Sequence, residues 1–478
     1  MNLYAIVLGI IVITLLGVSL ARLGKVKTKA DYLVAGRSLP AFVLVFTLLS
    51  SWIGSGSLLG GAENAYRHGF AALWQASGGW IGLLLIYFIA PRARKFAQFT
   101  IPDLLESRYN QTARLLGVIA VLFTYTAITS YQFIGGGDII HLIFPGVSST
   151  NGAYILAGFV IVFTAIAGMG SVAYMDVVIG MLATVTLIVA LPVLIHLAGG
   201  WSAVHAALPA THFQLFGDIR PINAAELFLP TCLLMLGNQS MYQKFFSAKT
   251  ERDATVAVGG WMVGTIILET VIVGVAVVGS ALFRTGEVAD HPREILAYTA
   301  THAFGGSHLL NILGALLVGA IFAKVVSTAN NYLFSPATNL VNDVFVRYIR
   351  PEAGNSEILM VSRVMVVALG CWALVQALHI KSVLAMSLYA YTIYSAALTP
   401  VILAAFFWRR ATAAGAVSSI AAGTIVTVGW KYLTPHLPPV LAQRDAILPA
   451  LILSVVGLVV VSFLTAAPSE AKLRPFEG

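Results

Sequence analysis

Long runs of apolar residues, separated by short polar stretches, repeat along almost the whole chain. A helix needs roughly 20 mostly apolar residues to cross the hydrocarbon core of a bilayer. Strands of a membrane barrel would instead alternate apolar and polar residues over about ten positions. The continuous runs therefore predict an all-α polytopic membrane protein with thirteen transmembrane helices. The predicted spans are residues 2–21, 41–64, 70–91, 113–143, 152–168, 174–198, 223–243, 254–283, 308–340, 358–379, 382–408, 411–432 and 446–466.

The first apolar run is predicted to be a retained span. It has no basic residue before it, and no small-residue cleavage site follows it, whereas a secretory signal normally has both. No Gly/Ser-rich linker or low-complexity tract divides the rest of the chain. Residues 1–470 are therefore predicted to form a single transmembrane domain, and residues 471–478 a polar C-terminal tail.

The composition indicates that lipid, rather than water, surrounds most of the folded chain. Of the 478 residues, 58% are hydrophobic and 10% are charged, whereas soluble domains carry roughly a quarter charged residues. The net charge of +8 can indicate binding to nucleic acid. Here the basic residues lie mostly between apolar runs, so no nucleic-acid partner is expected. Cys232 and Cys371 both lie inside apolar runs and predict no disulfide framework.

The lysines and arginines predict the orientation, because cytoplasmic loops are enriched in both. With the N-terminus outside and the C-terminus in the cytoplasm, most of them fall in inner loops, which also requires an odd number of spans. The expected location is the plasma (inner) membrane. Lys324 is the only basic residue predicted to lie within a span. The inner-loop residues include Lys25, Lys27, Arg92, Arg94, Lys95 and Lys244.

Two spans are interrupted by glycines and hydroxyl residues at about half depth, at residues 50–57 and 236–240. Transporters often bind ions and solute at helices broken in the middle of the membrane. The alternative is tight helix packing through small residues. The interruptions lie five spans apart, as an inverted repeat of five plus five helices requires. The predicted repeats are residues 38–198 and 223–408.

Four polar residues inside or next to spans are candidates for an ion site. Ser327 and Thr328 offer two adjacent hydroxyl oxygens, although such residues also bond to their own helix carbonyls. Asp176 opens the sixth span and is either functional or a first-turn carboxylate at the interface. Lys324 lies deep in the ninth span, where a cation is costly and a functional role is the default. The alternative to a functional role is that the Lys324 side chain snorkels, so that its ammonium reaches the membrane interface.

Four motifs in order resemble the sodium/solute symporter family, which has the LeuT-type inverted-repeat fold. The resemblance covers nearly the whole chain. The motifs are residues 31–40 (DYLVAGRSLP), 65–69 (AYRHG) with Trp74, 100–109 (TIPDLLESRY) and 407–416 (FWRRATAAGA).

The resemblance implies a site for each function. The Na⁺ site would use backbone carbonyls of Ser50 and Ile53 and hydroxyls of Ser327 and Thr328. Asp176 matches an acidic residue near the cation exit path, where it would serve coupling together with Lys324. The residues that the resemblance places at or near the solute are Asn238, Ser57, Gln132, Gln239 and Thr392.

The sequence departs from the family pattern at two positions. Related symporters have a small residue where Lys324 stands, and a fixed ammonium there would oppose Na⁺ by Coulomb repulsion. Proton coupling, or Na⁺-independent transport with Lys324 in place of the bound cation, is therefore the alternative to Na⁺ coupling. Thr392 replaces a glutamine of sugar-transporting relatives, which weakens a sugar substrate. A half-helix N-terminus near Gly237 favours a carboxylate, hence an amino acid or small organic acid.

The predicted function is secondary active transport by alternating access, driven by a cation gradient, with Na⁺ as the expected ion and no other cofactor. The expected partners are a small solute, the cation and the bilayer. A membrane solute sensor is the alternative from another class, but it would need a signalling domain that the short tail does not provide. A membrane enzyme is disfavoured because the sequence lacks HExxH, GxSxG and GxxxxGK[ST] motifs.

Overall fold

The computed structural model of the chain describes residues 3–23, 28–90, 100–166, 168–285 and 287–476. Over these ranges the secondary structure is helical, and the β pairing is limited to one isolated bridge between Leu39 and Ala248. The predicted all-α fold is confirmed. The principal helices are α1 (Leu3–Leu23), α3 (Ala41–Trp52), α4 (Ala62–His68), α5 (Leu73–Ile86), α8 (Gln111–Ile143), α9 (Ser149–Ile166), α10 (Met169–Leu197), α12 (Pro221–Gly237), α13 (Gln239–Ser247), α14 (Glu251–Leu282), α17 (His308–Asn339), α18 (Asn355–Ala377), α19 (Val383–Ala397), α20 (Thr399–Phe407), α21 (Ala413–Leu433) and α23 (Ile447–Leu464).

Short helices connect or extend these elements. The π-helical segments are η2 (Gly56–Gly61), which lies between α3 and α4, and η6 (Leu340–Ile349), which prolongs α17. The other short helices include α2 (Lys29–Val34), α7 (Ile101–Arg108), α11 (Trp201–Ala207), α15 (Glu287–Asp290), α16 (Ile295–His302), α22 (Pro439–Ala442) and α24 (Glu470–Leu473).

Within the described residues each predicted span falls mainly on helix, but the number thirteen is not confirmed. Within the described ranges, ten helical stretches are long and apolar enough to cross a membrane, and two shorter apolar helices cover residues 3–18 and 41–52. The difference has a physical cause. Two of the three missing crossings are the second and seventh spans, which the predicted interruptions divide into pieces shorter than a membrane crossing. The third is the first span, of which residues 3–18 count among the shorter apolar helices.

Local capping explains why two of the family-like motifs begin short helices. Thr28 and Asp31 form a capping box at the start of α2, in which each side chain bonds the backbone of the other. Thr100 caps α7 by accepting from the amide of Asp103, and Pro102 stands in the first turn, where its missing N–H costs nothing.

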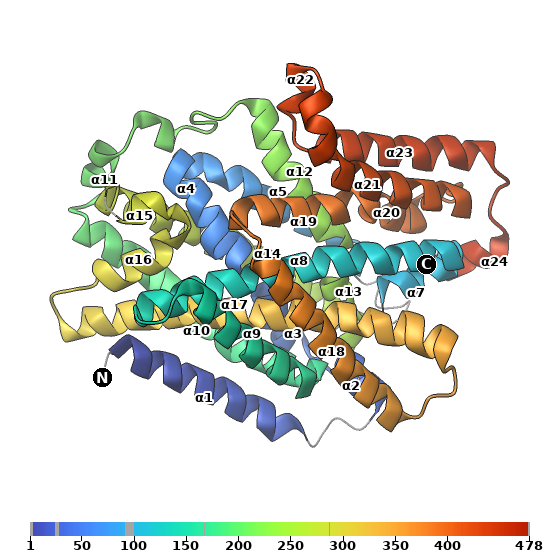
Figure 1. Cartoon of the computed structure of the whole chain (residues 1–478), viewed down its shortest axis with the longest axis horizontal. Coiled ribbons are helices and arrows are strands. Elements are labelled where there is room, and N and C mark those ends of the chain that lie inside the picture. The colour runs from blue at the N-terminus through green and yellow to red at the C-terminus, as the bar shows by residue number, and fades with distance from the viewer. Residues whose placement is uncertain (1–2, 24–27, 91–99, 167, 286, 477–478) are drawn as a thin grey trace.

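The long helix α8 forms ion pairs near both of its ends. Its 33 residues give a length of about 50 Å. Near its start Arg114 pairs with Asp343 at 2.5 Å, and near its end Asp138 pairs with Arg293 at 2.9 Å. Figure 1 shows α1 starting at the left end of the long axis and α24 at the right end. Ion pairs therefore tie connecting segments to α8 toward both ends of the bundle.

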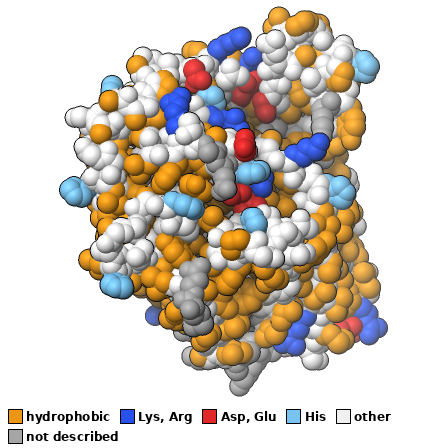
Figure 2. Space-filling model, turned by 60° about the vertical axis from the view of Figure 1, so that its left-hand side comes forward, with side chains coloured by type: hydrophobic (Ala, Val, Ile, Leu, Met, Phe, Trp, Pro, Cys, Tyr) orange, Lys and Arg blue, Asp and Glu red, His pale blue; other side chains and the backbone are white. Residues whose placement is uncertain are grey.

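The flanks of the bundle are apolar. Ile13, Val185 and Ile425 lie on different helices and are 70%, 63% and 69% exposed. Figure 2 shows a broad hydrophobic surface, with acidic and basic side chains gathered over the upper part and in a small group at the lower right. An apolar band between polar ends is the surface that a bilayer solvates. The chain is therefore an integral membrane protein.

The basic residues correct one part of the sequence prediction. Lys244 does not lie in an inner loop: it is on α13, has no exposed surface, and donates from Nζ to Asn331 Oδ1 at 2.8 Å and Ser240 Oγ at 3.1 Å. Lys324 is thus not the only basic residue buried among the spans. The reason is that α13 resumes directly after the second interruption. Lys25, Lys27, Arg92, Arg94 and Lys95 lie outside the described residues.

Candidate ion and solute sites

The first predicted interruption is present. Helix α3 ends at Trp52, and Ile53 has extended backbone angles (φ −83°, ψ 97°). Helical structure resumes after this turn, where the amides of Ser57 and Leu58 both donate to the carbonyl of Gly54, at 3.1 and 2.9 Å. The turn leaves main-chain oxygen atoms beside α17, deep in the bundle.

The structure brings together all four residues expected to form the ion site. Thr328 Oγ1 lies 3.0 Å from the carbonyl oxygen of Ser50 and 3.4 Å from that of Ile53, and Ser327 Oγ lies 3.4 Å from the Ser50 carbonyl. All four residues are buried. Two carbonyls and two hydroxyls form an oxygen-only group, which is the kind of ligand set that hard cations prefer.

Asp176 adjoins this group and is not an interfacial first-turn residue. It lies about two turns into α10 and has no exposed surface. Its carboxylate accepts hydrogen bonds from the hydroxyls of Thr47 and Ser327 and from Asn331 Nδ2. Since Ser327 touches both Asp176 and the Ser50 carbonyl, the carboxylate is one side chain away from the candidate ion position.

Lys324 also reaches this position rather than the membrane interface. Its side chain has no exposed surface, and Nζ donates to Ser50 Oγ at 3.2 Å. Ser50 in turn donates from Oγ to the backbone carbonyl of Asp176 at 3.1 Å. Snorkelling is therefore wrong for this side chain. The ammonium lies against the same residue whose carbonyl faces Ser327 and Thr328.

The second predicted interruption is present at Asn238, between α12 and α13, where the backbone turns (φ −59°, ψ 112°). Tyrosine hydroxyls form hydrogen bonds with the residues of this interruption. Tyr125 donates to Asn238 Oδ1 at 2.8 Å and accepts from the amide of Ser240 at 3.1 Å, and Tyr394 accepts from the amide of Gln239 at 3.1 Å. The freed N-terminal amides of α13 are thus satisfied by phenolic oxygens, which a carboxylate could replace.

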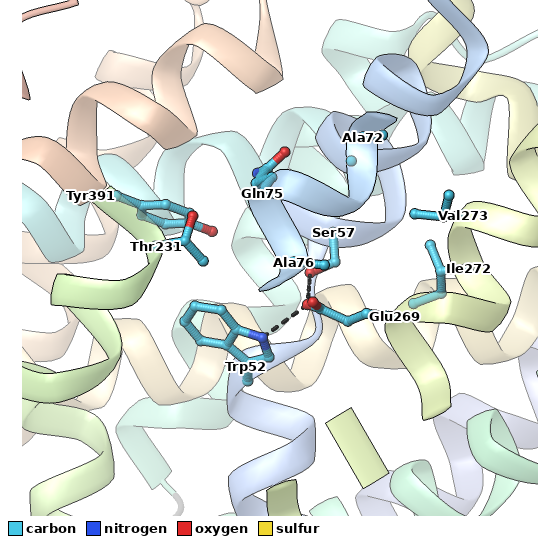
Figure 3. Close-up of a pocket in the computed structure, with 11 residues that line it drawn as sticks. Trp52, Ser57, Ala72, Gln75, Ala76, Thr231, Glu269, Ile272, Val273 and Tyr391 are labelled. Carbon is cyan, nitrogen blue, oxygen red and sulfur yellow. Dashed lines mark hydrogen bonds between the residues drawn. The ribbon is translucent and has the colours of Figure 1, made fainter. Parts of the chain in front are cut away.

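A narrow cavity of about 30 Å³ lies beside the first interruption. Figure 3 shows Glu269 of α14 on the right, with Trp52 and Ser57 pointing toward the carboxylate and Tyr391 and Thr231 on the left. Trp52 Nε1 donates to Glu269 Oε1 at 2.9 Å, and Ser57 Oγ donates to the same oxygen at 3.0 Å. The cavity thus joins α14 to the residues on both sides of the first break.

The structure separates the five residues expected at the solute. Ser57 lines the cavity. Gln132 lies at the first interruption, where its Oε1 accepts a hydrogen bond of 2.8 Å from the amide of Ser55. Asn238 and Gln239 lie at the second interruption, where Gln239 bonds Asn339 and Ser335. Thr392 lines a different cavity, with Arg444 and Asp445. These residues do not form one site in this conformation.

Glu269 is the residue of this cavity that sequence reasoning missed. It lies within the predicted span 254–283, and an acidic residue inside a span is itself a functional signal. That rule, applied to Lys324, would also have found Glu269. The hydrogen bonds of Glu269 could not be found in this way, because they join it to Trp52 and Ser57, which are 217 and 212 positions away in the sequence.

The turn at the first interruption requires Gly54, which gives the first testable prediction. A Cβ built on Gly54 would lie 2.4 Å from Thr328 Oγ1 and 2.6 Å from Thr328 Cβ. Gly54→Ala should therefore destabilise the protein by about 1–3 kcal/mol, as overpacking does. The measurement is the melting temperature of the purified protein in detergent. Gly429→Ala is the control, because its Cβ would meet nothing within 4 Å; equal melting temperatures for the two variants would contradict the prediction.

Comparison with known proteins yields one family. The family model "Sodium:solute symporter family" matches residues 32–423. The osmoregulated proline transporter OpuE of Bacillus subtilis (strain 168) is 25% identical over 484 aligned residues, which cover 98% of this chain and 96% of that protein. The sodium/proline symporter of Staphylococcus aureus is 27% identical over 463 residues, with 92% and 88% covered.

Solved structures show the same fold. A Na⁺-coupled sialic acid symporter in a substrate-bound, outward-open state superposes with a TM-score of 0.82 at 15% identity, covering 98% of this chain and 99% of that one. A nucleobase–cation symport-1 family transporter in a closed conformation gives a TM-score of 0.57 at 13% identity, covering 94% and 99%. At these identities the likeness concerns the fold, and it confirms the predicted transporter architecture.

Proposed function

Because the chain belongs to the sodium:solute symporter family, we propose that it is a secondary active transporter that moves a small amino acid together with Na⁺. The family is one of transporters, and the proposed role includes no catalysis and no cofactor apart from the coupling ion. The observation that carries the proposal is the oxygen group at the first interruption, where the carbonyls of Ser50 and Ile53 face the hydroxyls of Ser327 and Thr328.

The position of these oxygens supplies a physical route to coupling. Two of them belong to the end of α3 and the turn that follows it, and two belong to α17, which lies far away in the sequence. An ion held by both helices binds well only while they are apposed. A ligand shifts a conformational equilibrium only by its differential affinity for the two states. Na⁺ at this position would therefore favour the conformation in which α3 packs on α17.

An amino acid is the proposed solute, with proline the first to test. Both curated relatives described above carry proline in their names. The amides of Gln239 and Ser240 at the start of α13 support a carboxylate-bearing solute, because helix N-termini favour negative charge. A carboxylate would take over the hydrogen bonds that the hydroxyls of Tyr394 and Tyr125 now accept.

The proposed location is the plasma membrane, with the N-terminus outside and the C-terminus in the cytoplasm. This orientation places most of the lysines and arginines in inner loops. The opposite ends at which α1 starts and α24 lies in Figure 1 support an odd number of crossings. The bilayer, the solute and the cation are the proposed partners.

Lys324 favours a second candidate function. Its ammonium lies 3.2 Å from Ser50 Oγ, beside the oxygens of the proposed ion site. A resident positive charge could take the place of the bound cation, and transport would then be Na⁺-independent or driven by protons. In that case the carbonyl of Ser50 and the hydroxyl groups around it would serve the lysine rather than an ion from solution.

Uptake by proteoliposomes tests the proposal and is the second prediction. The protein is reconstituted with internal K⁺ and diluted into Na⁺ or choline buffer, and uptake of radiolabelled L-proline and a panel of other amino acids is measured. A Na⁺ gradient should raise initial uptake of at least one of them by about tenfold or more. Uptake that ignores Na⁺ and rises when the outside is acidified would support the second candidate instead.

A further inference from the structure

The cavity beside the first interruption contains a buried acidic group whose charge the chain does not balance. Glu269 is 4% exposed. Its Oε1 accepts from Trp52 and Ser57, whereas Oε2 is buried and has no hydrogen-bond partner among the described residues. None of the described residues lining the cavity is a lysine, arginine or histidine. Other buried acids differ, since Asp343 pairs with Arg114 and Asp138 with Arg293.

An unbalanced carboxyl group is costly inside a membrane protein, and such residues mark ligand or ion pathways. The two hydrogen bonds to Oε1 come from groups that can only donate or that donate here, an indole N–H and a hydroxyl. They support the carboxylate as an acceptor and leave Oε2 as a free acceptor, together with Oε1 of Gln75, which lines the same cavity and also has no hydrogen-bond partner among the described residues. A positively charged donor from solution would supply both the missing hydrogen bond and the missing charge.

The rest of the lining identifies the kind of cation. The rings of Trp52 and Tyr391 stack with centroids 6.3 Å apart and planes 25° from parallel, and both residues line the cavity. Aromatic rings attract organic ammonium groups. Ala72, Ala76, Ile272 and Val273 also line it and would pack against hydrocarbon. An inorganic cation would instead need a shell of oxygen ligands.

We propose that Glu269 binds the amine of the transported solute, with an ammonium N–H of the solute donating to Oε2. The substrate class is then a solute that carries a protonated primary or secondary amine beside an apolar group, such as an amino or imino acid. This inference rests on the proposed function in one respect, namely that the cavity at the first interruption holds the solute.

Ser57 gives this binding a path to the ion site. Its hydroxyl donates to Glu269, and its amide donates to Gly54, in the same turn that places the carbonyl of Ile53 beside Thr328. An amine that engages Glu269 is therefore held against the turn that carries one of the four proposed ion ligands, the carbonyl of Ile53. Solute and cation would both stabilise one geometry of this turn, which is the condition for positive coupling.

The third prediction tests amine binding without any ion gradient. Purified protein is mixed with matched pairs of probes that differ at the amine, L-proline with tetrahydrofuran-2-carboxylate and L-alanine with L-lactate, and its melting temperature is followed against probe concentration. At least one amine-bearing member should stabilise the wild type, and its amine-free partner should not. Glu269→Gln should weaken that binding by about tenfold or more.

Glu226→Gln is the matched control, because Glu226 is a buried acid on α12 that pairs with Arg444 at 3.2 Å and does not line this cavity. It should leave amine binding unchanged. The inference is overturned if Glu269→Gln binds the amine with wild-type affinity, if the amine-free probes bind as well as their partners, if no probe binds, or if Glu269→Gln alters only the response to Na⁺.

The outcome is separable from that of the proposed function. Failure of Na⁺-driven uptake would refute coupled transport and leave the binding result standing. If Glu269→Gln instead takes up an amino acid in a Na⁺ gradient with the same half-saturating amino acid concentration as the wild type, that result would refute the role of Glu269 and leave coupled transport standing.

Discussion

Thr328→Ala and Ser327→Ala should each raise the Na⁺ concentration that half-saturates uptake by about tenfold to a hundredfold. Each variant removes one hydroxyl from the proposed ion site, and a polar contact to a charged group is worth about 1.5–3 kcal/mol. Every 1.4 kcal/mol corresponds to about tenfold in affinity. Thr328 should show the larger effect, because its hydroxyl reaches the carbonyls of both Ser50 and Ile53.

The measurement is initial uptake in proteoliposomes over a series of external Na⁺ concentrations at constant ionic strength. Ser419→Ala is the control, since Ser419 is equally buried but bonds Ser454, between α21 and α23. It removes a buried serine hydroxyl without touching the ion site and should leave the Na⁺ response unchanged. A normal Na⁺ response in Thr328→Ala would place the coupling ion elsewhere.

Much of this site could be predicted because its signals are local in the sequence. The glycines and hydroxyls of residues 50–57 interrupt an apolar run, and an interrupted run indicates a broken helix before any contact is known. Ser327 and Thr328 are adjacent and follow Lys324 by three and four positions, so they share a helix face with it. The structure brings these hydroxyls and carbonyls within 3.0–3.4 Å of each other.

The cavity beside the first interruption could not be predicted to the same degree, because its residues meet only through packing. Glu269 bonds Trp52 across 217 positions of sequence, and no spacing rule connects them. Thr392 has the expected place along its span, but the rotation of α19 turns it toward the cavity of Arg444 and Asp445. Helix rotation is set by the neighbouring helices, which a single sequence does not specify.

Lys244 illustrates a different limit. The run that contains it is polar enough to be taken for a loop, and the prediction of an inner loop followed. The structure shows that α13 continues directly from the turn at Asn238 and that Asn331 of α17 accepts from the Lys244 ammonium. A polar half-helix buried in a bundle and a surface loop have the same local composition, so the partner decides between them.

Lys324→Met should lower the half-saturating Na⁺ concentration by about a hundredfold. The variant keeps most of the side-chain length and removes the charge that lies 3.2 Å from Ser50 Oγ. Two positive charges about 5 Å apart repel by roughly 3 kcal/mol at an effective dielectric constant near 20, which corresponds to about a hundredfold in affinity. The carboxylate of Asp176 would also strengthen Na⁺ binding, because the Lys324 ammonium would no longer offset its negative charge.

The same variant separates the two candidate functions through its stability. Without Lys324, Asp176 keeps only Lys244 as a nearby positive charge, so Lys324→Met should melt at a lower temperature than the wild type in K⁺ and recover in Na⁺, since a bound ion stabilises the folded state. Lys249→Ala, which removes an exposed lysine just after α13, should show neither effect. If the wild type ignores Na⁺ and Lys324→Met responds to it, the lysine stands in for the cation. If both respond to Na⁺ alike, Lys324 does not oppose the ion, and its burial beside Ser50 serves the packing of α17 on α3.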